Sequence, residues 1–424
     1  MKKLFTILFT VICTTGIYAQ GGTKRVLFIG NSYTYTNNLP QLLYDAAKTT
    51  GDTIVFDSST PGGYTFQNHT TNSTTLTKIA AGNWDYVVLQ EQSQLPSFTD
   101  GEVQSMVFPY ARQLDSLINL QNPCAETVFF MTWGRKNGDA SNCAVWPPVC
   151  TYQGMDSLLN LRYRMMADMY EAIVSPVGAV WHYIRDHHPS IELYNADESH
   201  PSLAGSYAAA CSFYTVICRK NPSYILYDGG LPAADALAIR DAARRVVYDS
   251  LLHWHVGEYD PLAAFNYTVV SGSEIQFINQ SIYASDFFWD FGDGSTSTDV
   301  SPVHLYAASG SYNVMLTAAH CDYSVTMDQT IDVITEAGQT VSPDVSILKP
   351  NPLTNRSVLT LPVIAESEEV QIHIFDISGR MIHTITAKPA LGKDIIIEKG
   401  NMKPGTYIVQ VNGSTPMRIR MVIE

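Results

Sequence analysis

The feature that most constrains the fold is a series of short, continuous apolar runs, separated by longer segments with helical periodicity, between Lys24 and about Gly257. A run that is apolar at every position has both faces buried, as in a strand of a parallel sheet with helices on both sides. The runs are residues 25–29, 53–56, 86–89, 128–131 and 177–180. The pattern therefore predicts an α/β sandwich built on a parallel sheet.

The segments between and after these runs supply the expected helices. The predicted helices are residues 39–49, 74–81, 100–120, 155–173 and 203–219. The Ala- and Arg-rich residues 233–253 predict one more helix, which closes the domain.

The pattern changes after Gly257. From Ala263 onward helical periodicity ends, and short β-type runs are separated by Gly, Ser and Asp turns, as in a small β-sandwich. After a linker at residues 335–344, a third segment alternates in strand fashion at residues 370–375, 394–398 and 406–411. We predict an α/β domain at residues 20–257 and two all-β domains at residues 263–336 and 345–424.

The first residues indicate an exported protein. Lys2 and Lys3 precede an apolar stretch that ends at Cys13, and Ala19 is suited to be the last residue before a cleavage site. This stretch is shorter than the ~18–20 apolar residues that span a bilayer, which favours a signal peptide at residues 1–19 over a membrane anchor. No later segment is long and apolar enough to predict a transmembrane helix.

The charge balance excludes one class of partner. The chain has 26 Lys and Arg against 40 Asp and Glu, which gives a net charge of −14. A protein that coats nucleic acid needs a basic surface to displace counterions from the phosphates. We therefore expect no nucleic-acid partner, and the same balance disfavours binding to an anionic membrane.

The cysteines indicate disulfides and no metal site. An even number of cysteines remains once Cys13 leaves with the signal peptide, and an exported chain can oxidise them. Cys143 and Cys150 can close a short loop. Cys211 and Cys218 would lie about 10.5 Å apart along one helix, too far to pair with each other, and can instead be small buried apolar residues. No CxxC or clustered His motif is present, so we predict no metal and no cofactor.

Two segments hold residues suited to nucleophilic catalysis. Ser32 directly follows the first apolar run, and ligands of open α/β sheets bind at the carboxyl ends of strands. Asp197 precedes His200 by three residues, so its carboxylate can hold one ring nitrogen and leave the other free as a general base. Each segment has a simpler interpretation: Ser32 as a turn residue, and residues 197–202 as a helix start capped by Ser202.

Taken together, in this order, the two segments resemble the SGNH (GDSL-like) hydrolase family. Residues 30–32, Gly-Asn-Ser, are similar to its first block, and Asp197-x-x-His200 is similar to its last. The resemblance implies a flavodoxin-like, three-layer α/β/α fold and ester hydrolysis through an acyl-serine. Ser32 would attack the ester, His200 would transfer the proton, and Asp197 would orient His200.

The same resemblance implies an oxyanion hole made by the backbone N–H of Ser32, a glycine and an asparagine. Gly63, which follows the second apolar run, fits the glycine. After the third run the chain has Gln90-Glu91-Gln92 where the family has Gly-x-Asn. A glutamine amide can donate the same hydrogen bond from a longer arm, so Gln92, or else Gln90, is the candidate.

Three residues are expected to contact the substrate. Asn31 and Gln90 are predicted to do so because they lie next to the proposed nucleophile and in the third block. Trp133 follows the fourth run and can line the cleft or pack in the core.

Residues 260 onward carry two further resemblances. The segments 288–295, 302–306 and 309–314 resemble a PKD domain, which implies an immunoglobulin-like sandwich that acts as a spacer or weak glycan or protein binder. In it, Gly292-Asp293-Gly294 would form a tight turn, Trp289 and Tyr312 would be core, and Asp290 and Asp293 are candidate calcium ligands.

The segments 349–352, 374–380 and 402–409 resemble the C-terminal sorting domain of the type IX secretion system in Bacteroidota, with Gly379 and Gly405 suited to turns. This resemblance implies a second immunoglobulin-like sandwich, secretion machinery as a partner, and a final location outside the cell or on its surface.

The sequence therefore predicts an extracellular serine esterase that removes acetyl or another short acyl group from a carbohydrate or similar ester. A lipase or thioesterase for longer acyl chains is the alternative enzyme. A catalytically inactive surface protein that binds glycans or mediates adhesion is the alternative outside enzymes.

Overall fold

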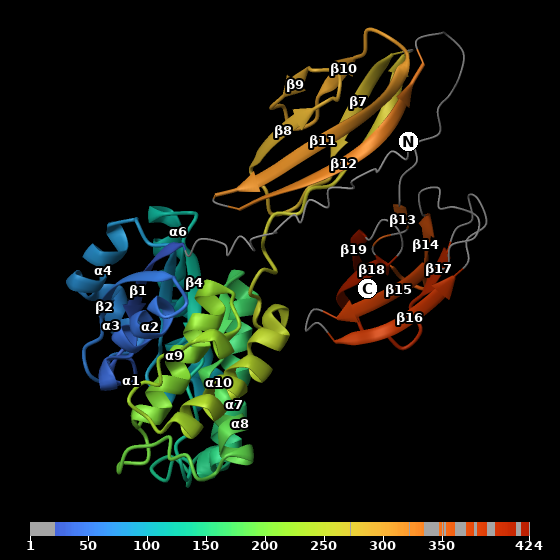
Figure 1. Ribbon diagram of the computed structural model, residues 1–424. Coiled ribbons are helices and arrows are strands. Elements are labelled where there is room, and N and C mark those ends of the chain that lie inside the picture. Colours follow the sequence, from blue (N-terminus) through green and yellow to red (C-terminus); the bar gives the residue numbers. More distant parts are fainter. Residues whose placement is uncertain are drawn as a thin grey trace, which may run out of the picture.

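The computed structural model describes residues 22–271, 273–321, 323–334, 347–349, 351, 353–360, 370–376, 380–387, 395–412 and 417–423. The predicted signal peptide, the linker at 335–344 and Gly379 lie outside these residues. The described chain forms one α/β domain followed by two all-β domains (Figure 1).

The α/β domain is built on a five-stranded parallel sheet, as predicted. Its strands are β1 (Thr23–Ile29), β2 (Thr53–Ser59), β3 (Tyr86–Leu89), β4 (Glu126–Phe130) and β5 (Ile173–Ser175). They are arranged in the order β2-β1-β3-β4-β5, which is the flavodoxin-like order. The predicted α/β/α architecture is confirmed.

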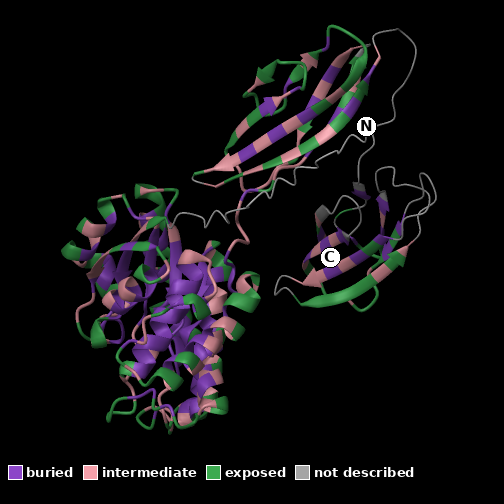
Figure 2. Ribbon diagram, viewed as in Figure 1, coloured by how far each residue is buried: buried purple, intermediate pink, exposed green. Residues whose placement is uncertain are grey.

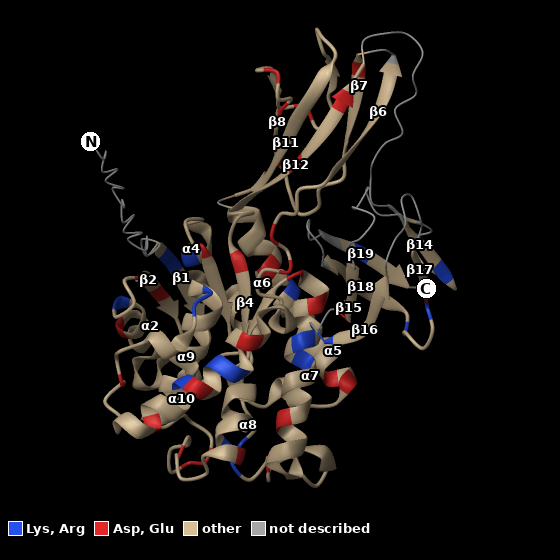
Figure 3. Ribbon diagram, turned by 45° about the vertical axis from the view of Figure 1, so that its right-hand side comes forward, with Lys and Arg blue, Asp and Glu red and all other residues tan. Residues whose placement is uncertain are grey.

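Helices cover the sheet on both sides. They are α1 (Ser32–Tyr35), α2 (Leu39–Lys48), α3 (Phe66–Thr71), α4 (Ser73–Ala80), α5 (Asp100–Met106), α6 (Phe108–Gln121), α7 (Tyr152–Tyr170), α8 (Val177–His187), α9 (Leu203–Cys218) and α10 (Ala233–Val246). Short 3-10 turns lie at Thr36–Asn38, Leu95–Ser97, Pro147–Cys150, Pro222–Tyr224 and Tyr248–Trp254. Helices α2 and α10 pack against α9, while α3 and α4 pack against α6. Both α7 and α10 carry charged residues of both signs (Figure 3).

Three sequence-based boundaries are corrected by the structure. The run 177–180, predicted as a strand, is the first turn of α8, and the strand is β5, just before Pro176. A short apolar run does not distinguish a buried strand from a buried helix. The predicted helix 100–120 divides between α5 and α6, because Pro109 lies in the first turn of α6 and has no backbone N–H to continue a helix. The predicted helix 233–253 ends at Val246.

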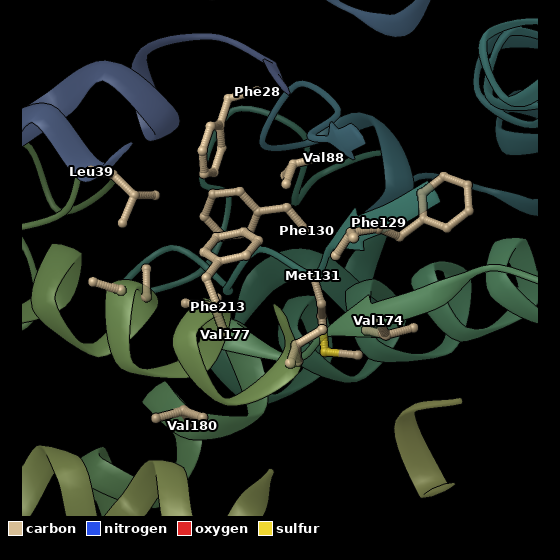
Figure 4. Close-up of a cluster of buried hydrophobic side chains, with 14 of the residues drawn as sticks. Phe28, Leu39, Val88, Phe129, Phe130, Met131, Val174, Val177, Val180 and Phe213 are labelled. Atoms are coloured by element: carbon tan, nitrogen blue, oxygen red, sulfur yellow. The ribbon is translucent and has the colours of Figure 1, made fainter. Parts of the chain in front are cut away.

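The core lies between the sheet and its helices (Figure 2). In the cluster of Figure 4, the ring of Phe213 from α9 meets Phe130 of β4 edge to face at 4.9 Å and Phe28 of β1 at 5.6 Å. These contacts fix α9, which follows the His200 loop, against the strand that precedes Ser32.

The first all-β domain is an antiparallel sandwich. One sheet holds β6 (Phe265–Ser271), β7 (Glu274–Asn279) and β10 (Val303–Leu305), and the other holds β8 (Asp286–Asp290), β9 (Thr296–Ser297), β11 (Gly310–His320) and β12 (Tyr323–Val333). The predicted Gly292–Gly294 turn connects β8 to β9. Trp289 is fully buried in the core, as predicted, and Tyr312 packs against the core from a partly buried position.

The second all-β domain also has two antiparallel sheets, which confirms the predicted class. One contains β13 (Ile347–Lys349), β14 (Arg356–Thr360) and β17 (Ile395–Glu398). The other contains β15 (Val370–Asp376), β16 (Met381–Ala387), β18 (Gly405–Asn412) and β19 (Met417–Ile423). Their apolar side chains form a separate core.

Two disulfides are present in the described chain. Cys143 pairs with Cys150, which closes the predicted short loop, and Cys211 and Cys218 are unpaired in α9. The second disulfide was not predicted: Cys124, just before β4, pairs with Cys321 at the turn between β11 and β12. It joins the α/β domain to the first all-β domain.

Candidate active site

The turn after β1 presents Ser32 at the carboxyl edge of the sheet. Asn31 caps α1, with its side-chain oxygen accepting from the Tyr33 N–H at 3.1 Å. Gly30 has no room for a side chain, since a Cβ there would lie 2.6 Å from Gln90 Oε1. Ser32 itself stays partly exposed. The turn is therefore tightly packed behind the serine and open in front of it.

Ser32, His200 and Asp197 form a continuous hydrogen-bonded series. Ser32 Oγ lies 2.8 Å from His200 Nε2, and His200 Nδ1 is in close contact with Asp197 Oδ2. The other carboxylate oxygen of Asp197 accepts from the backbone N–H groups of Ser199 at 3.1 Å and His200 at 2.9 Å. Burial opposes ionisation of Asp197, but the hydrogen bonds from His200 and Ser199 outweigh it and lower its pKa. The ionised carboxylate can hold Nδ1–H and leave Nε2 facing the serine.

The loop that carries His200 is held by backbone bonds. Its two ends meet at a bridge between Tyr194 and Pro201, and the Asn195 N–H donates to the His200 carbonyl at 2.8 Å. Ser202 then caps α9 by accepting from the Gly205 N–H. The capping interpretation of this segment and the catalytic one are thus both compatible with the structure.

Two backbone N–H groups, one on the turn of Ser32 and one on the loop after β2, remain unbonded in the part of the chain that the structure describes. Asn31 Nδ2 donates to the Tyr64 carbonyl at 2.9 Å, which ties the loop of Gly62 and Gly63 after β2 to the turn that carries Ser32. Gly63 is exposed and left-handed, with φ of 72°, a conformation that favours glycine. Within the described ranges, neither the Ser32 N–H nor the Gly63 N–H donates to a protein atom. Both donors are therefore free to bind an oxyanion.

The two glutamine candidates differ in how their amides are used. Gln90 is fully buried; its Oε1 accepts from the Asn31 N–H at 2.9 Å and Thr34 Oγ1 at 3.0 Å, and its Nε2 donates to the Glu91 carbonyl. Gln92 is partly exposed; its Oε1 is anchored by the backbone N–H groups of Gln94 and Leu95, and its Nε2 donates to Gln94 Oε1 at 3.2 Å. Gln92, whose exposed amide would exchange its Gln94 contact for the oxyanion, stays the proposed side-chain donor, while Gln90 holds the turn that carries Ser32.

The three residues expected to contact substrate are all buried behind the site. The expected contacts of Gln90 and Asn31 are corrected, because both ends of each amide are bonded within the protein. Trp133 is fully buried, stacked between Tyr33 at 4.7 Å and Trp181 at 3.8 Å, and donates Nε1–H to the Ser199 carbonyl. Of the two predicted positions for Trp133, lining the cleft or packing in the core, the structure shows the packed one, against the loop of residues 194–201 that carries His200.

Sequence reasoning missed His69, which lies under the nucleophile turn. Its Nε2 is 2.9 Å from the Gly30 carbonyl, which can only accept, so Nε2 carries the proton and Nδ1 accepts from Thr75 Oγ1. Burial lowers the pKa of His69 to about 4 and outweighs the carbonyl bond, which raises it. No motif contains His69, and the α3 helix brings it to β1 only in the folded chain.

Glu91, between the two glutamines, was also not assigned a role. It is fully buried and accepts from the Phe66 N–H at 3.0 Å and the Gln92 N–H at 2.5 Å. Burial raises the pKa of Glu91 to about 8, against these two hydrogen bonds, which lower it. Its carboxyl group fixes the backbone from which Gln92 extends.

The described residues contain no group of three or more His, Cys, Asp or Glu side chains arranged to hold a metal ion. Of the two candidate calcium ligands, Asp290 and Asp293, Asp293 accepts from His304 Nε2 at 2.7 Å and from the Ser295 N–H. No helix within the described ranges has the length and apolar character to cross a membrane.

Family models match the two C-terminal regions. Residues 260–335 match the PKD domain, and residues 348–424 match the secretion system C-terminal sorting domain. Both predicted resemblances are confirmed. The sorting domain indicates type IX secretion and a location outside the cell or on its surface.

Curated relatives match over short stretches. Collagenase ColA of Bacillus cereus is 28% identical over 170 residues, which is 34% of this chain and 18% of the collagenase. Collagenase ColQ1 of Bacillus cereus is 63% identical over 30 residues, 7% of this chain and 3% of that protein. The chain thus spans less than a fifth of the length of these relatives.

Solved structures are similar to individual regions. A DUF4886 family protein from Bacteroides uniformis is 19% identical, with 53% of this chain and 94% of that chain covered and a TM-score of 0.44. A candidate SGNH hydrolase from Slackia heliotrinireducens is 27% identical, with 45% and 97% covered and a TM-score of 0.36. The PKD1 domain of the Vibrio cholerae metalloprotease PrtV is 37% identical, with 18% and 99% covered and a TM-score of 0.17.

Proposed function

We propose that this chain is a secreted serine esterase of the SGNH type that removes a short acyl group, acetyl foremost, from a carbohydrate or similar ester. The observation that carries the proposal is the Ser32–His200–Asp197 series, with 2.8 Å between Ser32 Oγ and His200 Nε2. An inactive binding protein would have no need to keep a serine, a base and an orienting carboxylate in this geometry.

The proposed reaction has two steps. Ser32 Oγ attacks the ester carbonyl carbon while His200 Nε2 takes the serine proton. The bond from that carbon to the alcohol oxygen then breaks, and His200 gives the proton to the departing alcohol. Water attacks the acyl-serine with His200 again as base, which releases the acid and restores Ser32. The Ser32 and Gly63 N–H groups and the Gln92 amide would bind the oxyanion in both steps.

The surroundings of Ser32 favour a short acyl group. The neighbouring loops contribute Gly62, Gly63, Gln92 and Ser199, which offer little apolar surface to a long acyl chain. Tyr35 is about half exposed on α1, and its hydroxyl lies near Gly62. An exposed aromatic ring beside the serine suits the face of a sugar.

The direct test is hydrolysis of a chromogenic acetyl ester by the full chain. Ser32→Ala should lose activity by about 10³-fold or more, because the nucleophile is removed. Ser73→Ala, which changes an exposed serine on α4, is the matched control. Equal activity of wild type and Ser32→Ala would refute the proposal.

A series of acetyl, butyryl and octanoyl esters separates the two enzyme functions. The esterase assignment predicts that kcat/KM falls as the chain lengthens. A rise toward octanoyl would favour the lipase or thioesterase alternative.

A further inference from the structure

We propose that Arg135 forms a carboxylate-binding subsite beside Ser32, so that the preferred substrates are acyl esters of acidic sugars. This inference rests on the proposed function and names its substrate class. It is carried by the position of Arg135, by its unused donors and by the geometry of its guanidinium group.

The loop after β4 places Arg135 against the His200 loop. Trp133 Nε1 donates to the Ser199 carbonyl at 3.1 Å, and the Lys136 N–H donates to the Glu198 carbonyl at 2.9 Å. These two bonds flank Arg135 on both sides in the sequence. The backbone of Arg135 is therefore fixed next to the segment that carries the proposed base.

The guanidinium group is not satisfied by the protein. Its one contact with an acceptor in the described ranges is a long one, 3.5 Å from Nη1 to Asp139 Oδ1. That carboxylate already accepts from Ser141, Asn142 and Gln94 at 2.6 to 3.2 Å. Nη2 of Arg135 has no acceptor among the described residues, whereas the unpartnered Nε is buried and is not open to a ligand. Arg219 and Arg240, whose Nε atoms are likewise buried without a partner, each form a short ion pair, at 2.5 Å with Asp260 and at 2.6 Å with Asp228.

The group lies on the side of the active site. Arg135 Nη1 faces Asp139, whose other carboxylate oxygen accepts from Gln94 Nε2 at 2.7 Å in the loop that carries Gln92. Tyr33 follows Ser32, and its hydroxyl is 2.6 Å from Ser199 Oγ, beside His200. Arg135 thus lies between the loop that carries Gln92 and the loop that carries His200.

The chemistry of arginine identifies the ligand. A planar guanidinium with free N–H groups binds a carboxylate through two parallel hydrogen bonds. The side chain is 26% exposed, so a ligand can reach it while water around it is reduced. A uronic acid carries a carboxylate and esterifiable hydroxyls on one ring, and can therefore meet Arg135 and Ser32 at once.

The experiment compares monoacetates of methyl glucuronoside with the same positional monoacetates of methyl glucoside, which differ in one carboxylate. Wild type should prefer the uronate ester by about tenfold or more in kcat/KM at low salt, and less at high salt, because salt screens a partly exposed pair. Arg135→Gln should bring the ratio close to one, and Arg135→Lys should restore part of it. Lys136→Gln removes the same charge one residue away, from a side chain paired with Glu192, and should keep the preference.

Binding to the Ser32→Ala protein, measured by calorimetry with the same two esters, separates this inference from the proposed function. If wild type hydrolyses neither ester but the uronate binds in an Arg135-dependent manner, the esterase assignment fails and the subsite stands. Equal hydrolysis of both esters, an unchanged ratio in Arg135→Gln, or binding with no dependence on Arg135 would overturn the subsite.

Discussion

At the scale of single residues, buried polar groups hold the backbone on which the candidate catalytic residues lie. His69 holds the carbonyl of Gly30, two residues before Ser32, and Glu91 holds the backbone of Gln92. Local sequence could suggest Ser32, Asp197 and His200, because their roles follow from short spacings and from a strand end. His69 and Glu91 could not be assigned in this way, since their partners come from other elements.

The neutral state of His69 predicts a pH-dependent stability. Its folded pKa of about 4 lies below the ordinary value of 6.5, so the unfolded chain binds more protons between these values. The stabilisation of the folded state that comes from neutral His69 is complete above pH 6.5 and is lost as the pH falls toward 4. Between pH 7 and pH 5 this loss lowers the free energy of unfolding by about 2 kcal/mol.

Urea unfolding of wild type and His69→Gln at pH 7 and pH 5 measures this effect. Glu91, whose folded pKa is raised to about 8, changes stability in the opposite direction over the same range. We therefore compare the free energies of unfolding of wild type and His69→Gln at each pH. The advantage of wild type should be about 2 kcal/mol smaller at pH 5 than at pH 7. A difference that does not vary with pH would show that His69 is not held neutral.

At the scale of elements, the loop after β3 determines which glutamine can act. The sequence predicts strands and helices from apolar periodicity, and this was sufficient for β1, β3 and α9. It was not sufficient at 177–180, where a buried helix and a buried strand share one pattern. Gln90 and Gln92 likewise have the same side-chain chemistry. Only the folded loop shows that the Gln90 amide is buried and the Gln92 amide is partly exposed.

We expect Gln92→Ala to lower kcat by about 10²-fold with a much smaller change in KM, since an oxyanion donor acts mainly in the transition state. Steady-state kinetics on an acetyl ester measures both constants. Gln67→Ala, at an exposed position of α3, serves as the control. If Gln92→Ala retains wild-type kcat, the oxyanion hole consists of backbone donors alone.

At the scale of the whole molecule, the PKD domain is fixed to the edge of the sheet opposite the edge that carries Ser32. Cys124 precedes the start of β4, and Arg219, which bridges Glu126 and Asp260, also lies under the ring of Tyr323 from β12. A cavity of about 690 Å³ lies at this junction. Ser32, by contrast, follows the carboxyl end of β1. The disulfide spans 197 residues, so it depends on how the domains dock and has no local sequence signal.

This arrangement predicts separable effects of the two disulfides. The double variant Cys124→Ser/Cys321→Ser should lose about 2–5 kcal/mol of stability, because a long loop is no longer closed in the unfolded chain, with esterase activity retained. Cys143→Ser/Cys150→Ser opens a short loop next to Asp139 and should lose less stability and more activity. Thermal unfolding and acetyl ester kinetics of both variants measure this. If the Cys124/Cys321 variant instead lost more activity than the Cys143/Cys150 variant, the junction with the PKD domain would contribute to catalysis.

The central claim is that Ser32 is the nucleophile, and trapping its acyl intermediate tests it most directly. The full chain, mixed rapidly with an activated acetyl ester, quenched in acid and digested, should yield one acetylated peptide by mass spectrometry. The acetyl group should be on Ser32, it should disappear as hydrolysis finishes, and Ser32→Ala should yield no acetylated peptide. Acetylation at another residue, or equal labelling of the Ser32→Ala protein, would contradict it.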